Sequence, residues 1–126
     1  MITNFELITE ELTTDELKIL PIIIQGFKCH KKDNPIKAPA IIISLNEYLQ
    51  KQGFLIKITE VRLRKFVNYI RANGKLPLIA TPKGYYISDD KNELRMQVKS
   101  LQERAKSILN AADGLEIFIF SNEKAD

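Results

Sequence analysis

One amphipathic segment, residues 59–74, constrains the fold more than any other part of the chain. Its apolar residues recur at i, i+3, i+4 and i+7, which is the spacing of one buried face of an α-helix. Thr59 is a favourable N-cap residue and Gly74 is a favourable residue just past a helix end, so both ends of the helix are marked. The segment therefore predicts a helix whose buried face consists of Leu63, Phe66, Val67 and Ile70.

The opposite side of this predicted helix carries cations and an amide. Such a surface suits a groove lined with phosphates and base edges, as in the major groove of DNA. A solvated surface helix that happens to be basic is the alternative, because runs of charge usually lie on solvated faces. The residues on this side are Arg64, Lys65, Asn68 and Arg71, with Arg62 and Tyr69 on one flank.

The segments around the basic helix add further predicted elements. Residues 75–80 and 85–88 are short β-prone runs, and the turn 81–84 between them contains Pro and Gly, which predicts a hairpin. Ahead of the basic helix, residues 39–52 form a second amphipathic segment, which the short link 53–58 joins to it. The predicted order is therefore helix, short turn, basic capped helix and hairpin.

This order, over residues 13–88, resembles the winged helix-turn-helix family, and residues 64–86 look like small winged-helix proteins of phages and mobile elements. The resemblance implies a mainly α fold with a small β-hairpin wing, an α+β class, followed here by a long C-terminal helix. It also implies that the second helix of the pair lies in the major groove and that the wing touches the DNA backbone.

The resemblance gives each candidate contact a role. Arg64, Lys65 and Asn68 are expected to face the major groove, where an amide can bond adenine and a guanidinium suits guanine. Thr59 stands at the start of the helix as its N-cap and belongs to the candidate DNA-binding set. Four further cations are expected to hold phosphates. These four are Arg62, Arg71, Lys75 and Lys83.

The net charge of +3 conceals a cationic middle between acidic ends. Residues 1–26 contain five acids and one base, and residues 85–126 contain eight acids and six bases. Residues 27–52 contain five bases and two acids, and residues 53–84 contain seven bases and one acid. An anionic partner that binds one module requires a distribution of this kind.

The chain before residue 39 is expected to supply an arm and a first helix. Residues 1–12 form a candidate N-terminal arm, either a short strand or an extended segment. Thr13 and Glu16 form a capping box that opens a helix, and Pro21 inside that helix predicts a kink or a late start. The expected buried face of the helix consists of Leu17, Leu20, Ile24 and Phe27.

Residues 89–126 form a third region. Apolar residues between positions 94 and 112 alternate steps of four and three, which is a heptad seam. The seam either packs along its own domain or pairs with a second copy in a homodimer. Gly114 is expected to end the helix, and the β-prone run 115–120 either adds to the small sheet or is buried in the dimer. The candidate dimer interface consists of Leu94, Val98, Leu101, Ala105 and Ile108.

The composition limits which metal sites, cofactors and reactions are expected of the chain. One cysteine, Cys29, and one histidine, His30, cannot build a tetrahedral zinc site within a chain, so no metal is expected. The five glycines form no phosphate cradle and no nucleophile motif is present, so we expect neither catalysis nor a cofactor. The lone cysteine, the lack of a signal peptide and the lack of a long apolar run predict a cytoplasmic protein that does not enter a membrane.

These features together predict a non-catalytic protein that binds double-stranded DNA, either as a transcription regulator or as a phage-type control or replication accessory protein. The rival interpretation is a winged-helix module that binds another protein and whose basic face is incidental, because a fold does not fix a function. Retention on DNA that depends steeply on salt distinguishes the first interpretation from the second.

Overall fold

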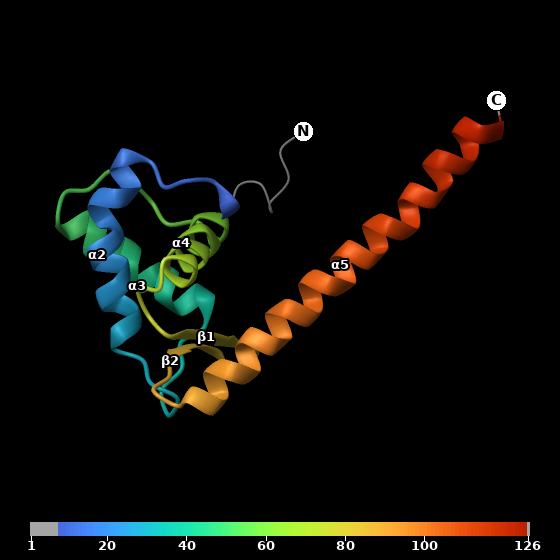
Figure 1. Cartoon of the computed structure of the whole chain (residues 1–126). Coiled ribbons are helices and arrows are strands. Elements are labelled where there is room, and N and C mark those ends of the chain that lie inside the picture. The colour runs from blue at the N-terminus through green and yellow to red at the C-terminus, as the bar shows by residue number, and fades with distance from the viewer. Residues whose placement is uncertain (1–7, 126) are drawn as a thin grey trace. The chain divides into compact units, whose positions relative to one another are not determined.

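The structure is a computed structural model that describes residues 8–125, with side chains described as far as residue 121. Most of the expected N-terminal arm, residues 1–7, lies outside the described residues. Within the described range the chain forms four helices and one two-stranded antiparallel hairpin, so the mainly α, α+β class is confirmed (Figure 1). The chain divides into two units, residues 1–89 and residues 90–126.

The first long helix, α2 (Thr14–Lys28), begins at the predicted capping box. The Glu16 amide donates to the Thr13 hydroxyl at 3.2 Å, and the Thr13 amide donates to the Glu16 carboxylate at 2.9 Å. The helix runs through Pro21, so the late start is not observed. The expected buried face is wrong at Leu17, which is 46% exposed, and Ile24 is only partly buried, whereas Glu16 and Ile19 are buried. The buried residues of α2 are Glu16, Ile19, Leu20, Ile23 and Phe27.

The second helix, α3 (Ala38–Lys51), has a proline in its first turn and packs Ile41, Leu45 and Leu49 into the core. The connection to the next helix is held by one side chain. Asn46 donates through Nδ2 to the carbonyl of Ile58 at 3.0 Å, and the Ile58 amide donates to Asn46 Oδ1 at 2.7 Å. This pair of bonds fixes the end of the turn immediately before the basic helix begins.

The basic helix, α4 (Glu60–Ala72), has both predicted ends. The Arg62 amide donates to the Thr59 hydroxyl at 3.1 Å, which is the expected N-cap bond. At the other end Gly74 has a φ of 61°, its amide donates to the Arg71 carbonyl, and the following amide donates to the Ile70 carbonyl. These two bonds are those of a Schellman motif. The predicted face of Leu63, Phe66, Val67 and Ile70 is buried.

The hairpin consists of β1 (Leu78–Thr81) and β2 (Gly84–Ile87), in which Thr81 pairs with Gly84 across a two-residue turn. Ile36 adds a bridge on the other side of β2, because its amide and carbonyl both bond to Tyr85, at 2.9 Å and 2.8 Å. Gly84 has a φ of 127°, and a Cβ at this position would lie 2.6 Å from the Ile36 carbonyl group. Glycine is therefore required where the hairpin meets the segment before α3.

One hydrophobic core joins α2, α3, α4 and the hairpin. The fully buried Phe27 lies near its centre and makes an edge-to-face contact with Tyr85, with ring centroids 5.5 Å apart. This contact attaches the hairpin to the helices. Seventeen hydrophobic residues of the described chain are buried, and all of them lie between Leu12 and Ile87. The core therefore belongs entirely to the 1–89 unit.

The last helix, α5 (Lys91–Ala125), is continuous over 35 residues. The prediction that Gly114 ends it is wrong, and so is the strand predicted for residues 115–120, which are helical. Among the described residues positive φ angles occur at Gly53, Gly74 and Gly84, whereas Gly114 lies within the helix. A short apolar run fits a strand or a helix equally well by its pattern, and one glycine inside a helix costs only about 1 kcal/mol. No helix in the described part of the chain is long and apolar enough to cross a membrane.

Candidate nucleic-acid interface

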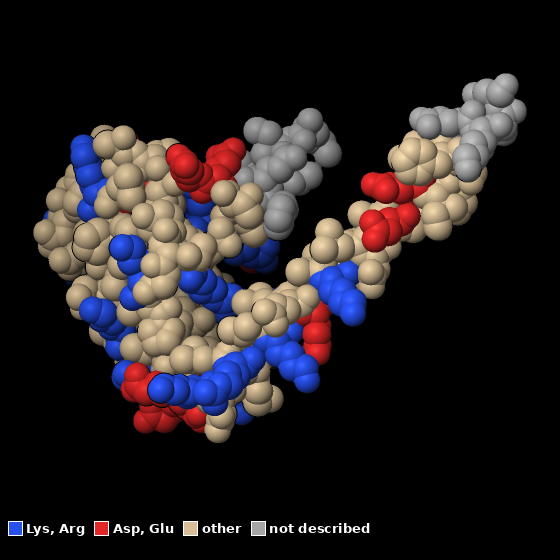
Figure 2. All heavy atoms as spheres, in the orientation of Figure 1, with Lys and Arg blue, Asp and Glu red and all other residues tan. Residues whose placement is uncertain are grey.

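The exposed side of α4 is narrower than the sequence pattern indicates. Glu60, Arg64, Asn68 and Ala72 are exposed and recur at intervals of four, so they form one stripe along the helix. On the visible face of the 1–89 unit, Lys and Arg side chains are spread widely, whereas Asp and Glu gather in fewer places (Figure 2). The stripe therefore presents one acid, one cation and one amide, Glu60, Arg64 and Asn68, and its Asn68 end also lines a pocket that contains Glu10 and Glu11.

Arg64 is held only weakly. Its Nη2 lies 3.3 Å from Glu60 Oε1 in the preceding turn, and the two side chains are 50% and 68% exposed. An exposed pair of this kind contributes about 0.3–0.5 kcal/mol, so a stronger anionic partner can replace it. The guanidinium is thus anchored near the start of α4 and is still available to a ligand.

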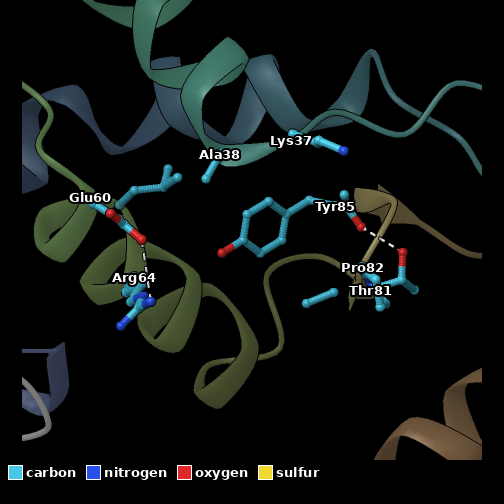
Figure 3. Close-up of a pocket in the computed structure, with 10 residues that line it drawn as sticks. Lys37, Ala38, Glu60, Arg64, Thr81, Pro82 and Tyr85 are labelled. Atoms are coloured by element: carbon cyan, nitrogen blue, oxygen red, sulfur yellow. Dashed lines mark hydrogen bonds and ion pairs between the residues drawn. The ribbon is translucent and has the colours of Figure 1, made fainter.

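A cleft of about 310 Å³ separates the start of α4 from the hairpin. Lys37, at the beginning of α3, lies on one side of it, and the rest of its polar lining consists of Glu60, Arg64, Thr81 and Tyr85. Figure 3 shows the Tyr85 ring between the start of α3 and α4, with its hydroxyl directed toward the helix that carries Glu60 and Arg64. The cleft therefore combines two cations and hydroxyl groups, which bind phosphate oxygens, with one carboxylate, Glu60, which is paired with Arg64.

The tip of the hairpin presents Lys83 to solvent. The Thr81 hydroxyl donates to the Gly84 carbonyl at 3.0 Å and accepts from the Lys83 amide at 3.2 Å, so the turn is fixed by its own side chain. Lys83 is exposed at a defined position beyond the cleft. Lys75 is also exposed, just after the end of α4, so both lysines of the predicted phosphate set face solvent.

Lys65 does not lie on the exposed side, and its predicted place there is wrong. It is 8% exposed, and its Nζ lies 2.6 Å from Oε1 of Glu16, which is 1% exposed. The sequence pattern placed Lys65 opposite the apolar face, but the start of α2 covers that part of α4. A buried lysine without a carboxylate partner would be strongly unfavourable, so the two residues are buried as a pair.

Glu16 is the centre of a small buried charge cluster that also includes Arg62. Arg62 Nε donates to Glu16 Oε2 at 3.0 Å, and its Nη1 donates to the Lys57 carbonyl at 2.7 Å. Burial raises the pKa of Glu16, but the hydrogen bonds from Lys65, the Thr13 amide and Arg62 outweigh it and the net pKa is lowered. Glu16 is therefore a carboxylate at neutral pH, and Arg62 serves to neutralise it.

Arg71 also has an internal role. Its Nε donates to the Leu78 carbonyl at 3.0 Å, and its Nη2 is enclosed by protein. This contact joins the end of α4 to β1 of the hairpin. The expectation that Arg62 and Arg71 hold phosphates is therefore corrected, because both guanidinium groups hold the helix against its neighbours.

One residue of the cleft, Lys37, was missed by the sequence analysis. Lys37 precedes Pro39, a residue that favours the first turn of a helix, and this signal could have placed a cation at a helix start. The position of Tyr85 depends on its contact with Phe27 and on a strand register that could not be read from the sequence. Thr59, by contrast, lies where it was predicted, with its hydroxyl engaged in capping α4.

The surroundings of Cys29 and His30 indicate no metal site. Within the described part of the chain no group of three His, Cys, Asp or Glu side chains could hold a metal ion. His30 Nδ1 lies 2.8 Å from the Asn34 carbonyl, and Cys29 is an exposed free thiol whose Sγ lies 3.4 Å from the Gln25 carbonyl. Both residues thus bond within their own loop and helix end.

Comparison of the chain with protein-family models, with curated proteins and with solved structures finds no match. The functional argument therefore depends on the geometry of the site itself.

Proposed function

We propose that the 1–89 unit binds double-stranded DNA without catalysis, in the manner of a winged helix-turn-helix domain. In this proposal α4 enters the major groove and the hairpin is the wing. The observation that supports it most is the cleft between them, with Arg64 on one side, Lys37 on another and Lys83 beyond it at the hairpin tip. A helix and a projecting turn that both carry cations fit a duplex that offers one groove and the adjacent phosphates.

The corrected set of contacts is smaller than the predicted one. Arg64 and Asn68 remain candidates for base edges, because both are exposed on one stripe of α4. Lys37, Lys75 and Lys83 are candidates for phosphates, because all three are exposed and positively charged. The biological use we propose is transcription regulation or a phage-type control or replication accessory role, in a protein that acts as a homodimer.

The test is binding of the full chain to random-sequence duplex DNA over a range of salt concentrations. Neutralising three or four phosphates predicts a slope of log affinity against log salt of about −3 to −4 per module, from about −0.9 for each phosphate. Lys51→Ala is the matched control, since Lys51 is an exposed lysine at the far end of α3 from the cleft. Weak binding with a flat salt dependence would contradict the proposal.

The second candidate function is protein binding through the opposite side of the unit. A mainly apolar groove of about 460 Å³ lies between α2 and α3, and its lining includes Pro21, Ile22 and Tyr48. Such a groove could accept an apolar segment of another protein. A flat salt dependence together with loss of partner binding on Tyr48→Ala would favour this function over DNA binding.

A further inference from the structure

The apolar seam of α5 is longer than the sequence predicted. Because residues 115–120 are helical, the alternation of steps of four and three continues beyond Ala112 to Leu115 and Ile119. In a heptad lettered a to g, one set of these residues occupies position d and the other position a. The d residues are Leu94, Leu101, Ile108 and Leu115, and the a residues are Val98, Ala105, Ala112 and Ile119.

This seam lies open in the single chain. Val98, Leu101 and Ile108 are between 38% and 67% exposed, and Leu115 and Ile119 are 67% and 55% exposed. An apolar stripe of such length on an isolated helix marks a surface that another molecule covers. We propose that the cover is a second copy of α5, and that the two helices run antiparallel. The proposal rests on the self-association proposed above and does not depend on DNA binding.

Antiparallel pairing aligns every seam residue with a partner. When Val98 lies opposite the partner's Leu115, Ala105 lies opposite the partner's Ile108. The remaining layers are Leu101 with the partner's Ala112 and Leu94 with the partner's Ile119. In this register every one of the eight seam residues has a partner in a layer. The two residue numbers in each layer add up to the same value.

Side-chain size favours this arrangement over a parallel one. In a parallel pair each seam residue meets its own copy, so Ala105 and Ala112 form two layers with only alanine, beside full layers of Leu101 and Ile108. Antiparallel pairing instead places each alanine opposite a leucine or an isoleucine. Facing large and small side chains fill the space between two helices more evenly, and evenly filled cores are the stable ones.

Charge along α5 favours the same arrangement. Residues 91–106 contain five bases and two acids, whereas residues 107–125 contain three acids and one base. Figure 2 shows this separation along the helix. A parallel pair would set the two basic halves side by side, but an antiparallel pair sets each basic half against an acidic half. In the register above, Arg95 flanks the seam beside the partner's Glu116, and this pair occurs twice.

The apolar residues outside the seam give a third reason. Ile117, Phe118 and Phe120 are 65%, 69% and 56% exposed, and they occupy heptad positions f, g and b, outside the a and d positions of the seam. Two parallel helices would leave them at the far end of both chains. Antiparallel pairing brings them level with residues 93–96 of the partner, close to where that chain continues into its 1–89 unit. They then lie beside the first turns of the partner's α5 instead of extending together at one end of the pair.

Three serines allow a direct test of the orientation. Ser100, Ser107 and Ser121 all occupy heptad position c and are exposed, so each can be changed to cysteine and spin-labelled in a Cys29→Ser background. Antiparallel pairing places residue 107 level with residue 106 of the partner, so its two labels lie within about 25 Å. Residue 121 lies level with residue 92, which is an axial offset of about 44 Å at 1.5 Å per residue. Residue 100 gives an intermediate offset of about 20 Å.

The expected result is a dimeric mass and a graded series of distances between identical labels, shortest at residue 107 and longest at residue 121. Equal short distances at all three positions would establish parallel pairing and overturn the proposal. A monomeric mass at micromolar concentration without dipolar coupling would also overturn it. Duplex DNA binding is measured on the same samples, so that a graded series without salt-dependent DNA binding removes only the proposed function.

Discussion

The two units of the chain differ in whether their apolar side chains are buried. In the 1–89 unit three helices and a hairpin cover one another, and the core residues from Leu12 to Ile87 are buried within a single chain. In α5 a seam of similar regularity, from Leu94 to Ile119, is mostly exposed. The comparison teaches that the same kind of helical pattern describes either a finished core or half of an interface. In our proposal, what differs is whether the covering surface lies in the same chain or in a second copy.

The largest expected effect is the loss of stability when the buried charge cluster of the 1–89 unit is disrupted. Glu16→Gln should lower the free energy of unfolding by about 3–5 kcal/mol, because it leaves the buried Lys65 without its carboxylate. Chemical denaturation monitors the change. Asp15→Asn removes an 80% exposed acid from the same turn and should change the free energy of unfolding by less than about 0.5 kcal/mol. Equal effects of the two substitutions would contradict the assigned role of the cluster.

Lowering the pH should gradually remove the stability that the Glu16 carboxylate contributes. Burial raises the pKa of Glu16 but its hydrogen bonds to Lys65, Thr13 and Arg62 lower it further, so the folded pKa lies below the unfolded value of about 4.3. The stability that Glu16 contributes is thus fully present above the unfolded pKa and is lost as the pH falls through the folded pKa. The difference in unfolding free energy between wild type and Glu16→Gln should be constant above about pH 5 and narrow below about pH 4. A difference that persists unchanged to pH 2 would refute this explanation.

The corresponding substitution in the other unit is Leu101→Glu, at the middle of the α5 seam. A buried unpaired charge in each helix should weaken dimerisation by about 100-fold or more and leave a folded monomer. Light scattering gives the mass, and the melting temperature of the 1–89 unit should change by less than about 2 °C. If the seam packs within its own chain, the melting temperature falls and the mass stays constant. Lys99→Glu is the matched control, because Lys99 lies on the same helix but outside the seam.

A smaller effect is expected at the exposed stripe of α4, in the proposed DNA-binding surface. Arg64→Ala should weaken binding to the preferred duplex by about 1–3 kcal/mol and relax the preference at one base pair, because a bidentate base contact carries that much discrimination. Competition between matched and mismatched duplexes measures both changes. An equal loss on every sequence would assign Arg64 to a phosphate. The exposed Lys51, away from the cleft, provides the control substitution to alanine.

The smallest expected effect is at the hairpin tip. Lys83→Ala should weaken binding about equally on all sequences and reduce the magnitude of the salt slope by about 1, because an exposed lysine at a turn neutralises one phosphate. Titration of the variant at several salt concentrations measures the slope. An unchanged slope would show that Lys83 does not contact a phosphate.

Local signals account for the parts of the fold that were predicted correctly. Thr13, Thr59 and Gly74 mark helix ends through bonds to residues three or four positions away, and such signals can be read directly from the chain. The partner of Lys65 could not be found in this way, because Glu16 is 49 positions earlier and only the packing of α2 on α4 brings the two together. The apolar run 115–120 failed for another reason, since its pattern is compatible with a strand and with a helix.

Side-chain bonds hold α4 in place at three points. Lys65 bonds Glu16 of α2, and Arg71 bonds the Leu78 carbonyl of β1. Just before α4, Asn46 of α3 bonds the turn residue Ile58. Because α4 is already held in place, binding of a ligand requires little ordering of the backbone. Most of the ordering then falls on long exposed side chains such as Lys37 and Lys83, at about 0.5–1.5 kcal/mol for each one immobilised. Recognition by such a preformed frame should be fast in association, so that different sequences are distinguished mainly by how long each complex lasts.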